Sequence, residues 1–308
     1  MILKIGTRAS RLALAQSKWV KSQIESRHGD ITVELVTIKT TGDKILDSPL
    51  SKIGGKGLFV KEIEEALLEE RIDLAVHSMK DVPGELPGKL FFPTFPERED
   101  PRDAFISLKH KSLDKLPDGA KVGTSSLRRS AQLLRMRPDL IISPLRGNVD
   151  TRIKKLKAGE FEAIILASAG LRRLGLAESI THCISINQIL PAIAQGALGI
   201  EIRRNDANAM QVLDFLNHKP TEITVKAERA FLKKLEGGCQ VPIAAFARMK
   251  GEILTLKGLV SELDGSRVVK DEMSGKSQNA EEIGLSLAEK LIDSGAGEIL
   301  DKIYGKIS

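Results

Sequence analysis

Basic and hydroxyl side chains cluster just after a predicted strand in the middle of the chain. The segment GTSSLRR at 123–129 carries Ser126 followed by Arg128 and Arg129 at the start of a predicted helix. A helix start offers free backbone N–H groups and a positive dipole end, and guanidinium groups bind carboxylate or phosphate through paired hydrogen bonds. The segment therefore predicts an anion site. An ordinary capped helix with solvated arginines is the alternative interpretation.

Two later segments repeat this arrangement. SPLRGNVDTR at 143–152 contains Arg146 and Arg152, and ASAGLRRLG at 167–175 contains Arg172 and Arg173. The carboxyl ends of parallel strands meet at one edge of a sheet, so the arginines of three successive loops would converge on one crevice. This pattern predicts binding of an anionic ligand. The alternative is a solvated basic face.

An acidic residue follows another predicted strand. HSMKDVP at 77–83 places Lys80 and Asp81 just past a buried-type strand. A carboxylate at a strand end that faces a basic crevice is a candidate general acid–base group or cation stabiliser. The alternative is that Asp81 only caps a turn.

A cysteine lies in a glycine-rich loop, LEGGCQVP at 235–242. The two glycines allow close approach to the sulfur of Cys239, which suits a nucleophile or an attachment point. A buried structural thiol is the alternative. Cys183, in THCISIN, has no such setting, and we interpret it as structural.

The motifs exclude several classes of site. GGKGLF at 54–59 is not a nucleotide-binding loop of the GxxxxGK[ST] type, because position 50 is Leu and position 57 is Gly. The loop is either a mobile lid that carries Lys56 or a plain turn. The sequence contains no CxxC and no HExxH, and its five histidines are scattered, so we predict no metal site.

The elements that must position these residues alternate between strand and helix. A Pro-rich linker at 96–102 follows the first group of elements. That group consists of predicted strands at 3–7, 31–40 and 74–79 and predicted helices at 11–27, with Ser10 as its N-cap, and 58–70. Strand, loop and helix then repeat from 121 to 175, which favours a mainly parallel sheet. Towards the end, the pattern predicts a helix at 222–238, strands at 244–250, 252–263 and 266–275 joined partly by an Asp264–Gly265 turn, and a last helix at 281–295.

Composition limits the partners. The chain has 308 residues, enough for two or three domains, and its net charge is +6. Residues 121–173 hold twelve Lys or Arg against four Asp or Glu, which should attract an anion. Aromatic residues are only 4% of the chain, which argues against nucleic acid. No apolar run approaches a membrane span of about 20 residues, and the first residues do not resemble a signal peptide, so we expect a cytoplasmic protein.

The ordered set of motifs resembles the porphobilinogen deaminases, also called hydroxymethylbilane synthases. The resemblance covers about residues 7–245 through these stretches: TRASRLALAQ, TTGDKILDSPLSKIGGKGLFVKEIEEALLE, DLAVHSMKDVP, EREDPRDAF, GTSSLRR, LRGNVDTRI, ILASAGLRRLG, LPAIAQGALGIE and LEGGCQVPIAA. It implies an α/β fold with two domains like those of periplasmic binding proteins, a cleft between them, and a small α+β C-terminal domain. The implied boundaries are 1–96 with 197–214, then 102–190, then 219–308.

The resemblance also implies the chemistry. The family polymerises four porphobilinogen molecules into 1-hydroxymethylbilane with release of ammonia, in porphyrin and haem biosynthesis. Its dipyrromethane cofactor is bound through a thioether to the cysteine matched here by Cys239, and Asp81 matches its catalytic aspartate. The implied cofactor ligands are Lys80, Ser126, Arg128, Arg129 and Arg146. The implied substrate ligands are Arg8, Ser10, Lys56, Arg152, Arg173 and Gln195. The expected protein is a monomer whose only partner is porphobilinogen, with no nucleic acid, membrane or metal.

Two other functions would share parts of this pattern. A non-catalytic anion-binding module on the same two-domain fold would need the arginines but would have no role for the Cys239 loop. A nucleic-acid binder would use the basic segment but lacks aromatic side chains on which bases stack. The intact mass of the purified protein separates the three, because only the deaminase predicts a covalent dipyrrole.

Overall fold

A computed structural model describes residues 1–44, 60–236 and 241–305. Lys56 and Cys239 lie outside the described residues. The chain divides into two compact units. The first unit consists of Met1–Glu99 and Ala197–Glu222, and the second of Asp100–Gly196 and Ile223–Ser308.

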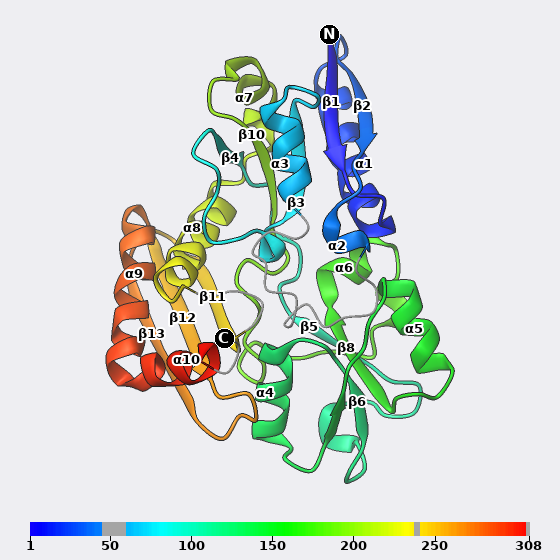
Figure 1. Cartoon of the computed structure of the whole chain (residues 1–308), viewed down its shortest axis with the longest axis vertical. Coiled ribbons are helices and arrows are strands. Elements are labelled where there is room, and N and C mark those ends of the chain that lie inside the picture. Colours follow the sequence, from blue (N-terminus) through cyan, green and yellow to red (C-terminus); the bar gives the residue numbers. More distant parts are fainter. Residues whose placement is uncertain (45–59, 237–240, 306–308) are drawn as a thin grey trace. The chain divides into compact units, whose positions relative to one another are not determined.

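The first unit is built on a five-stranded sheet of order β2-β1-β3-β10-β4. Its strands are β1 (Ile2–Thr7), β2 (Thr32–Thr37), β3 (Leu74–Ser78), β4 (Leu90–Thr94) and β10 (Leu198–Arg203). β1 runs parallel to β2 and β3, whereas β10 runs antiparallel to β3 and to β4. Figure 1 shows β10 returning from much later in the chain to lie between β3 and β4. The sheet is therefore mixed, because this late strand enters it in the reverse direction.

Helices cover both faces of this sheet. They are α1 (Arg11–Arg27), α2 (Thr41–Lys44), α3 (Lys61–Leu68) and α7 (Ala207–Leu213), with short 3-10 turns η2 (Met79–Asp81) and η5 (Asp214–Leu216). The predicted bounds of α1 are confirmed, and its N-cap Ser10 accepts a hydrogen bond from the backbone N–H of Ala13 at 3.3 Å. One core contains Val20 and Ile24 of α1, and the other contains Ile63 and Leu67 of α3.

The second unit contains a five-stranded sheet of order β7-β6-β8-β5-β9. Its strands are β5 (Asp103–Ile106), β6 (Lys121–Gly123), β7 (Ile141–Ser143), β8 (Ala163–Ala167) and β9 (His182–Cys183). β6 is parallel to β7 and β8, as the repeated strand–helix pattern predicts. β5 is antiparallel to β8 and β9, so this sheet is also mixed.

The helices of this sheet follow its parallel strands. They are α4 (Leu127–Met136), α5 (Val149–Lys157) and α6 (Ser168–Arg173), with 3-10 turns η3 (Leu113–Lys115) and η4 (Ala177–Ser179). Ser126 caps α4 through a 3.4 Å hydrogen bond from the N–H of Arg129, and Asn148 caps α5. Such caps satisfy N–H groups that have no partner inside the helix. The strand-to-helix turns therefore have well-defined starts.

A three-stranded antiparallel sheet, β11 (Ile243–Lys250), β12 (Ile253–Ser261) and β13 (Val268–Lys276), confirms the three predicted late strands. Gly265 has φ +73° in the predicted turn between β12 and β13. The accompanying helices are α8 (Lys219–Lys234), α9 (Ala280–Leu291) and α10 (Gly297–Tyr304), with a 3-10 turn η6 (Ser277–Asn279) and a π-helical segment (Ile292–Ala296). The single predicted helix at 281–295 is incomplete, since the chain bends at Gly295 (φ +100°) and continues as α10.

The fold is thus mixed α/β, with two five-stranded sheets and a small α+β part at the C-terminal end. The three-stranded sheet belongs to the same compact unit as the second five-stranded sheet. The three domain boundaries and the cleft inferred from the resemblance remain predictions. In the part of the chain that the structure describes, every helix is too short or too polar to span a bilayer.

Candidate active site

Four predicted residues of the first unit lie at one edge of its sheet. β1 and β3 are parallel neighbours, with Ile5 paired to Leu74, so their carboxyl ends meet at the same edge. Arg8 and Ser10 follow β1, and Lys80 and Asp81 follow β3 in the η2 turn. The Asp81 side chain is exposed and that of Lys80 is half-buried. This edge combines cations with a carboxylate that solvent and a ligand can reach.

The first residue of the η2 turn, Met79, anchors the turn in the core of the first unit. Met79 is buried, and its backbone N–H donates to the carbonyl oxygen of Ala197 at 3.1 Å. Val82 closes the turn by donating to the carbonyl oxygen of Met79 at 3.3 Å. The residue before the turn, Ser78, accepts a 2.9 Å hydrogen bond from the side-chain amide of Gln16 on α1. The backbone that carries Lys80 and Asp81 is therefore tied to both β10 and α1.

The second unit gathers its predicted residues in the same way. Because β6, β7 and β8 are parallel neighbours, the loops after them lie at one edge of the sheet, as predicted. Arg146 lies in the loop after β7, Arg152 on α5 and Arg173 at the end of α6, and all three are half-buried. Arg152 donates to the carbonyl oxygen of Gly147 at 2.8 Å and Arg173 to that of Gly196 at 2.6 Å. The backbone thus orients these two guanidinium groups.

Arg128 and Arg129 lie deeper than the sequence suggested. Both side chains are buried, and both bind the carboxylate of Asp103 on β5. Arg128 donates to Oδ2 at 2.8 Å, while Arg129 donates to Oδ1 at 3.0 Å through Nε and at 2.7 Å through Nη2. Further donors reach the carbonyl oxygens of Leu190 and Ile165. All three guanidinium nitrogens of Arg129, and Nη1 of Arg128, are thus engaged inside the unit.

Gln195 joins this buried network. Its side-chain amide donates to Oδ1 of Asp103 at 2.9 Å and to the carbonyl oxygen of Pro101 at 2.7 Å. Burial alone would raise the pKa of Asp103, but attraction to Arg128 and Arg129 outweighs it and holds that pKa well below its ordinary value. Asp103 was not among the predicted site residues, although the acidic stretch EREDPRD in which it lies was a visible signal.

The charge of this network fits an anionic ligand. Two guanidinium groups face the single carboxylate of Asp103, and Nε of Arg128 is buried without a hydrogen-bond partner among the described residues. A buried excess cation is costly unless an anion or further acceptor balances it. A cofactor that bears carboxylate side chains meets this requirement, so the residues present fit such a group.

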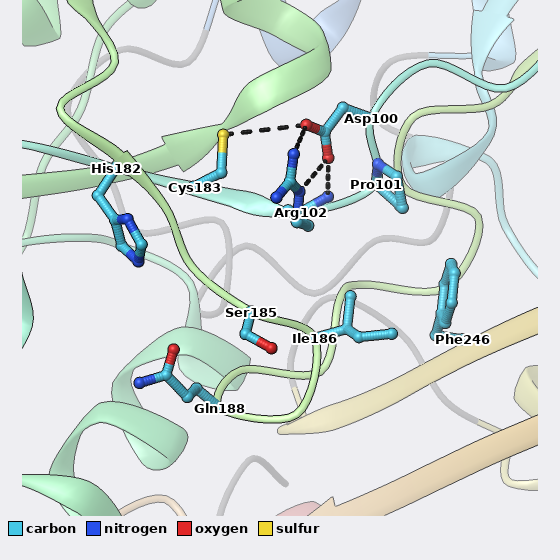
Figure 2. Close-up of a pocket in the computed structure, with 9 residues that line it drawn as sticks. All are labelled: Asp100, Pro101, Arg102, His182, Cys183, Ser185, Ile186, Gln188 and Phe246. Carbon is cyan, nitrogen blue, oxygen red and sulfur yellow. Dashed lines mark hydrogen bonds and ion pairs between the residues drawn. The ribbon is translucent and has the colours of Figure 1, made fainter.

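A separate pocket of about 550 Å³ in the second unit contains none of the predicted site residues. Figure 2 shows Arg102 paired with Asp100 on one side and Phe246 on another. Asp100 accepts 2.9 and 2.7 Å hydrogen bonds from Arg102, and the sulfur of Cys183 lies 3.6 Å from Oγ of Ser168. We do not assign the reaction to this pocket on its volume, because the guanidinium group of Arg102 is already paired with the carboxylate of Asp100.

Comparisons with known proteins decide the family. Residues 3–211 match the sequence model described as porphobilinogen deaminase, dipyromethane cofactor binding domain, and residues 222–293 match porphobilinogen deaminase, C-terminal domain. The chain belongs to the porphobilinogen deaminase family. It is 55% identical over 302 residues to the porphobilinogen deaminase of Geobacter sulfurreducens, which covers 98% of this chain and 95% of the relative. It is 57% identical over 304 residues to that of Nitratidesulfovibrio vulgaris strain Hildenborough, covering 98% and 96%.

Solved structures give a weaker likeness. A nutrient binding protein from Burkholderia cenocepacia bound to methionine aligns with 77% of this chain and 98% of its own, at 17% identity and a TM-score of 0.44. A periplasmic substrate-binding protein of an ABC transporter from Coxiella burnetii aligns with 70% and 91%, at 16% identity and a TM-score of 0.44.

Membership of this family gives the enzyme its activity. It is a transferase that polymerises porphobilinogen into hydroxymethylbilane in tetrapyrrole synthesis, and its first two thirds form the family's dipyrromethane cofactor binding domain. Of the predicted site residues, the first unit brings together Arg8, Ser10, Lys80 and Asp81. The second unit brings together the loops that carry Ser126, Arg146 and Arg173, and it links Arg128, Arg129 and Gln195 through Asp103.

Proposed function

We propose that Asp81 is the catalytic carboxylate of this deaminase and that the basic side chains at the two sheet edges hold the carboxylates of pyrrole rings. The observation that carries this proposal is the position of Asp81. It is an exposed acid directly after a central strand, beside Lys80 and on the same sheet edge as Arg8. An acid that served only to close the turn would not need cationic neighbours.

The binding roles follow from charge. Each pyrrole of the substrate and cofactor carries carboxylate side chains, so a growing chain is a polyanion, and arginines bind carboxylates in bidentate pairs. Lys80, Ser126 and Arg146 would hold the dipyrromethane, with Arg128 and Arg129 contributing through their buried network. Arg8, Ser10, Arg152, Arg173 and Gln195 would hold the substrate rings, with Gln195 acting from within the Asp103 network.

The bond changes give Asp81 its task. The aminomethyl C–N bond of porphobilinogen breaks, ammonia leaves, and the exocyclic carbon becomes part of a cation. That carbon then bonds to the α-carbon of the preceding pyrrole, which loses a proton. The dipyrromethane supplies the first such α-carbon. A carboxylate beside the ring nitrogens stabilises the cation and accepts or relays the proton.

Several assignments concern residues outside the described part of the chain or properties of the whole enzyme. We assign covalent attachment of the cofactor to Cys239 on the family motif that it matches, and a substrate contact to Lys56 on its position in the GGKG loop. We also infer that the enzyme is cytoplasmic and, from the family, that it is a monomer. Aromatic residues are only 4% of the chain, which argues against a nucleic-acid partner.

The test is single-turnover kinetics of Asp81→Asn on protein whose dipyrrole content has been measured by intact mass. We expect the variant to load cofactor and bind porphobilinogen but to form the first new C–C bond slowly. Loaded Asp81→Asn protein with a wild-type rate would rule out the catalytic role of Asp81 and leave it as a turn residue.

A further inference from the structure

A buried polar cluster lies behind the η2 turn, on the face of the first sheet that α3 covers. His77 on β3 is 6% exposed and Glu201 on β10 is 1% exposed. Glu64, in the first turn of α3, is half-buried and within electrostatic range of both. Buried charged side chains that serve no packing role are rare in a protein core, so this cluster needs an explanation.

The two residues on the strands are close but poorly satisfied. Nε2 of His77 lies 3.0 Å from Oε2 of Glu201, which makes an ion pair when the imidazole is protonated. The contact does not have hydrogen-bond geometry, and neither oxygen of Glu201 has a hydrogen-bond partner among the described residues. A buried carboxylate without hydrogen bonds is costly. Its environment therefore favours a nearby positive charge or proton.

Glu64 supplies a group that changes its charge near neutral pH. Burial, and then repulsion by Glu201, raise the pKa of Glu64 from its ordinary value of 4.5 to about 7, while His77 lowers it and Glu65 adds a smaller repulsion. Among the described residues, the charged groups that act on Glu64 are Glu201 from β10, His77 from β3 and Glu65 from its own helix.

Packing connects this cluster to the turn that carries Asp81. His77 is paired across the sheet with Gly199, and a Cβ atom at Gly199 would lie 2.2 Å from Sδ of Met79 and 2.8 Å from the ring of Phe92. The ring of Phe92 also packs edge-on against His77, with centroids 5.8 Å apart. Met79, the first residue of η2, therefore belongs to the same packed group of side chains as His77.

We propose that His77, Glu201 and Glu64 form a proton-holding cluster that positions the Lys80–Asp81 turn, so that turnover responds to pH through groups that do not touch the substrate. The proposal rests on the catalytic role assigned to Asp81. With Glu64 neutral, α3 adds no negative charge from this position to the buried His77–Glu201 contact. With Glu64 ionised, a second negative charge repels Glu201 and loosens the packing beneath Met79.

The decisive experiment compares the pH profiles of kcat for cofactor-loaded wild type and Glu64→Gln. The glutamine of this variant is uncharged at every pH, as Glu64 is when protonated. The ratio of its kcat to that of the wild type should therefore rise between about pH 6 and pH 8, where a group that titrates near 7 changes its charge. KM for porphobilinogen should stay within about twofold, because no substrate contact is removed. Glu69→Gln is the matched control, since Glu69 is exposed at the other end of the same helix.

A constant kcat ratio for Glu64→Gln across this pH range would overturn the proposal. Glu201→Gln gives a second comparison, because it removes the repulsion and should also change the shape of the profile. A merely structural role would lower stability in these variants without changing that shape. If Asp81→Asn turns over normally, the proposed catalytic role of Asp81 fails. If Asp81→Asn is impaired but the pH profiles of kcat for Glu64→Gln and Glu201→Gln match that of the wild type, only the role proposed for the buried cluster fails.

Discussion

Arg129 donates to one carboxylate oxygen of Asp103 through both Nε and Nη2, at 3.0 and 2.7 Å. The same carboxylate binds Arg128 from the preceding position of α4 and Gln195 from a distant loop. One fully buried acid on β5 therefore fixes three side chains that the family motifs select as ligands. The arrangement of these three proposed ligands therefore depends on a carboxylate that is itself fully buried.

The first prediction is that Asp103→Asn destabilises the protein strongly. Removing one partner of a buried ion pair leaves uncompensated charge and typically costs about 3–5 kcal/mol. Urea denaturation at neutral pH measures the loss. The control is Asp139→Asn, which removes the acid of a surface pair with Arg137 and should cost no more than about 1 kcal/mol. Equal losses in the two variants would contradict the central role of Asp103.

The same carboxylate predicts a pH dependence. Because the pKa of Asp103 is lowered on folding, its stabilisation is fully present above the unfolded value of about 3.9 and is lost as pH falls below it. The free energy of unfolding of the wild type should therefore decrease on acidification below about pH 4. In Asp103→Asn this part of the decrease should be absent.

The sequence predicted features that depend on local chemistry. The bounds of α1 follow from Ser10 and from apolar residues at helical spacing, and the arginine loops follow from strand–helix alternation. Asp103 was missed because its partners are 25 and 26 residues away, beyond any local pattern. The antiparallel entry of β10 was likewise invisible, since strand direction is set by the path of the chain. The second C-terminal helix was missed because the predicted helix ended at Gly295, where the chain bends and then continues as α10.

The cysteine prediction separates the two thiols by mass. Cys239→Ser should yield protein without the dipyrrole, because the sulfur that forms the thioether is gone. Cys183→Ser should keep it, since the Cys183 sulfur, on β9, lies against Oγ of Ser168 on α6 and outside the glycine-rich loop. Denatured intact mass spectrometry distinguishes the two. A dipyrrole adduct that maps to Cys183 would refute the assignment to Cys239.

The next prediction concerns the arginines at the edge of the second sheet. Replacing Arg146, Arg152 or Arg173 with Leu should stall elongation, because each removes a charged partner worth about 1.5–3 kcal/mol. Stalled enzyme should carry partial chains that are visible by intact mass. Arg135→Leu, at an exposed position on α4, is the control and should elongate normally. Full turnover without stalled species in all three variants would favour a solvated basic face.

For Asp81, we expect a loss of rate rather than of binding. Asp81→Asn removes the charge and the proton relay but keeps the size of the side chain, so the rate of C–C bond formation should fall by about a hundredfold or more. A group that acts mainly in the transition state changes kcat more than ground-state affinity. Glu85→Gln changes another exposed carboxylate of the same loop and should leave the rate within a few-fold of wild type. Rapid-quench kinetics on cofactor-loaded protein makes the comparison.

The last prediction tests the titration of Glu64 through stability, without any assay of activity. The pKa of Glu64 rises on folding from 4.5 to about 7, so the folded chain keeps a proton that the unfolded chain has released. Its contribution to the free energy of unfolding is therefore fully present below 4.5 and is lost as pH rises through about 7. Glu64→Gln cannot titrate, so its melting temperature relative to wild type should climb across this window and level off above it. Glu69→Gln should give a flat difference, because Glu69 is exposed and pairs only with Arg71 among the described residues. Parallel melting curves for wild type and Glu64→Gln throughout the window would show that Glu64 ionises as an ordinary surface acid.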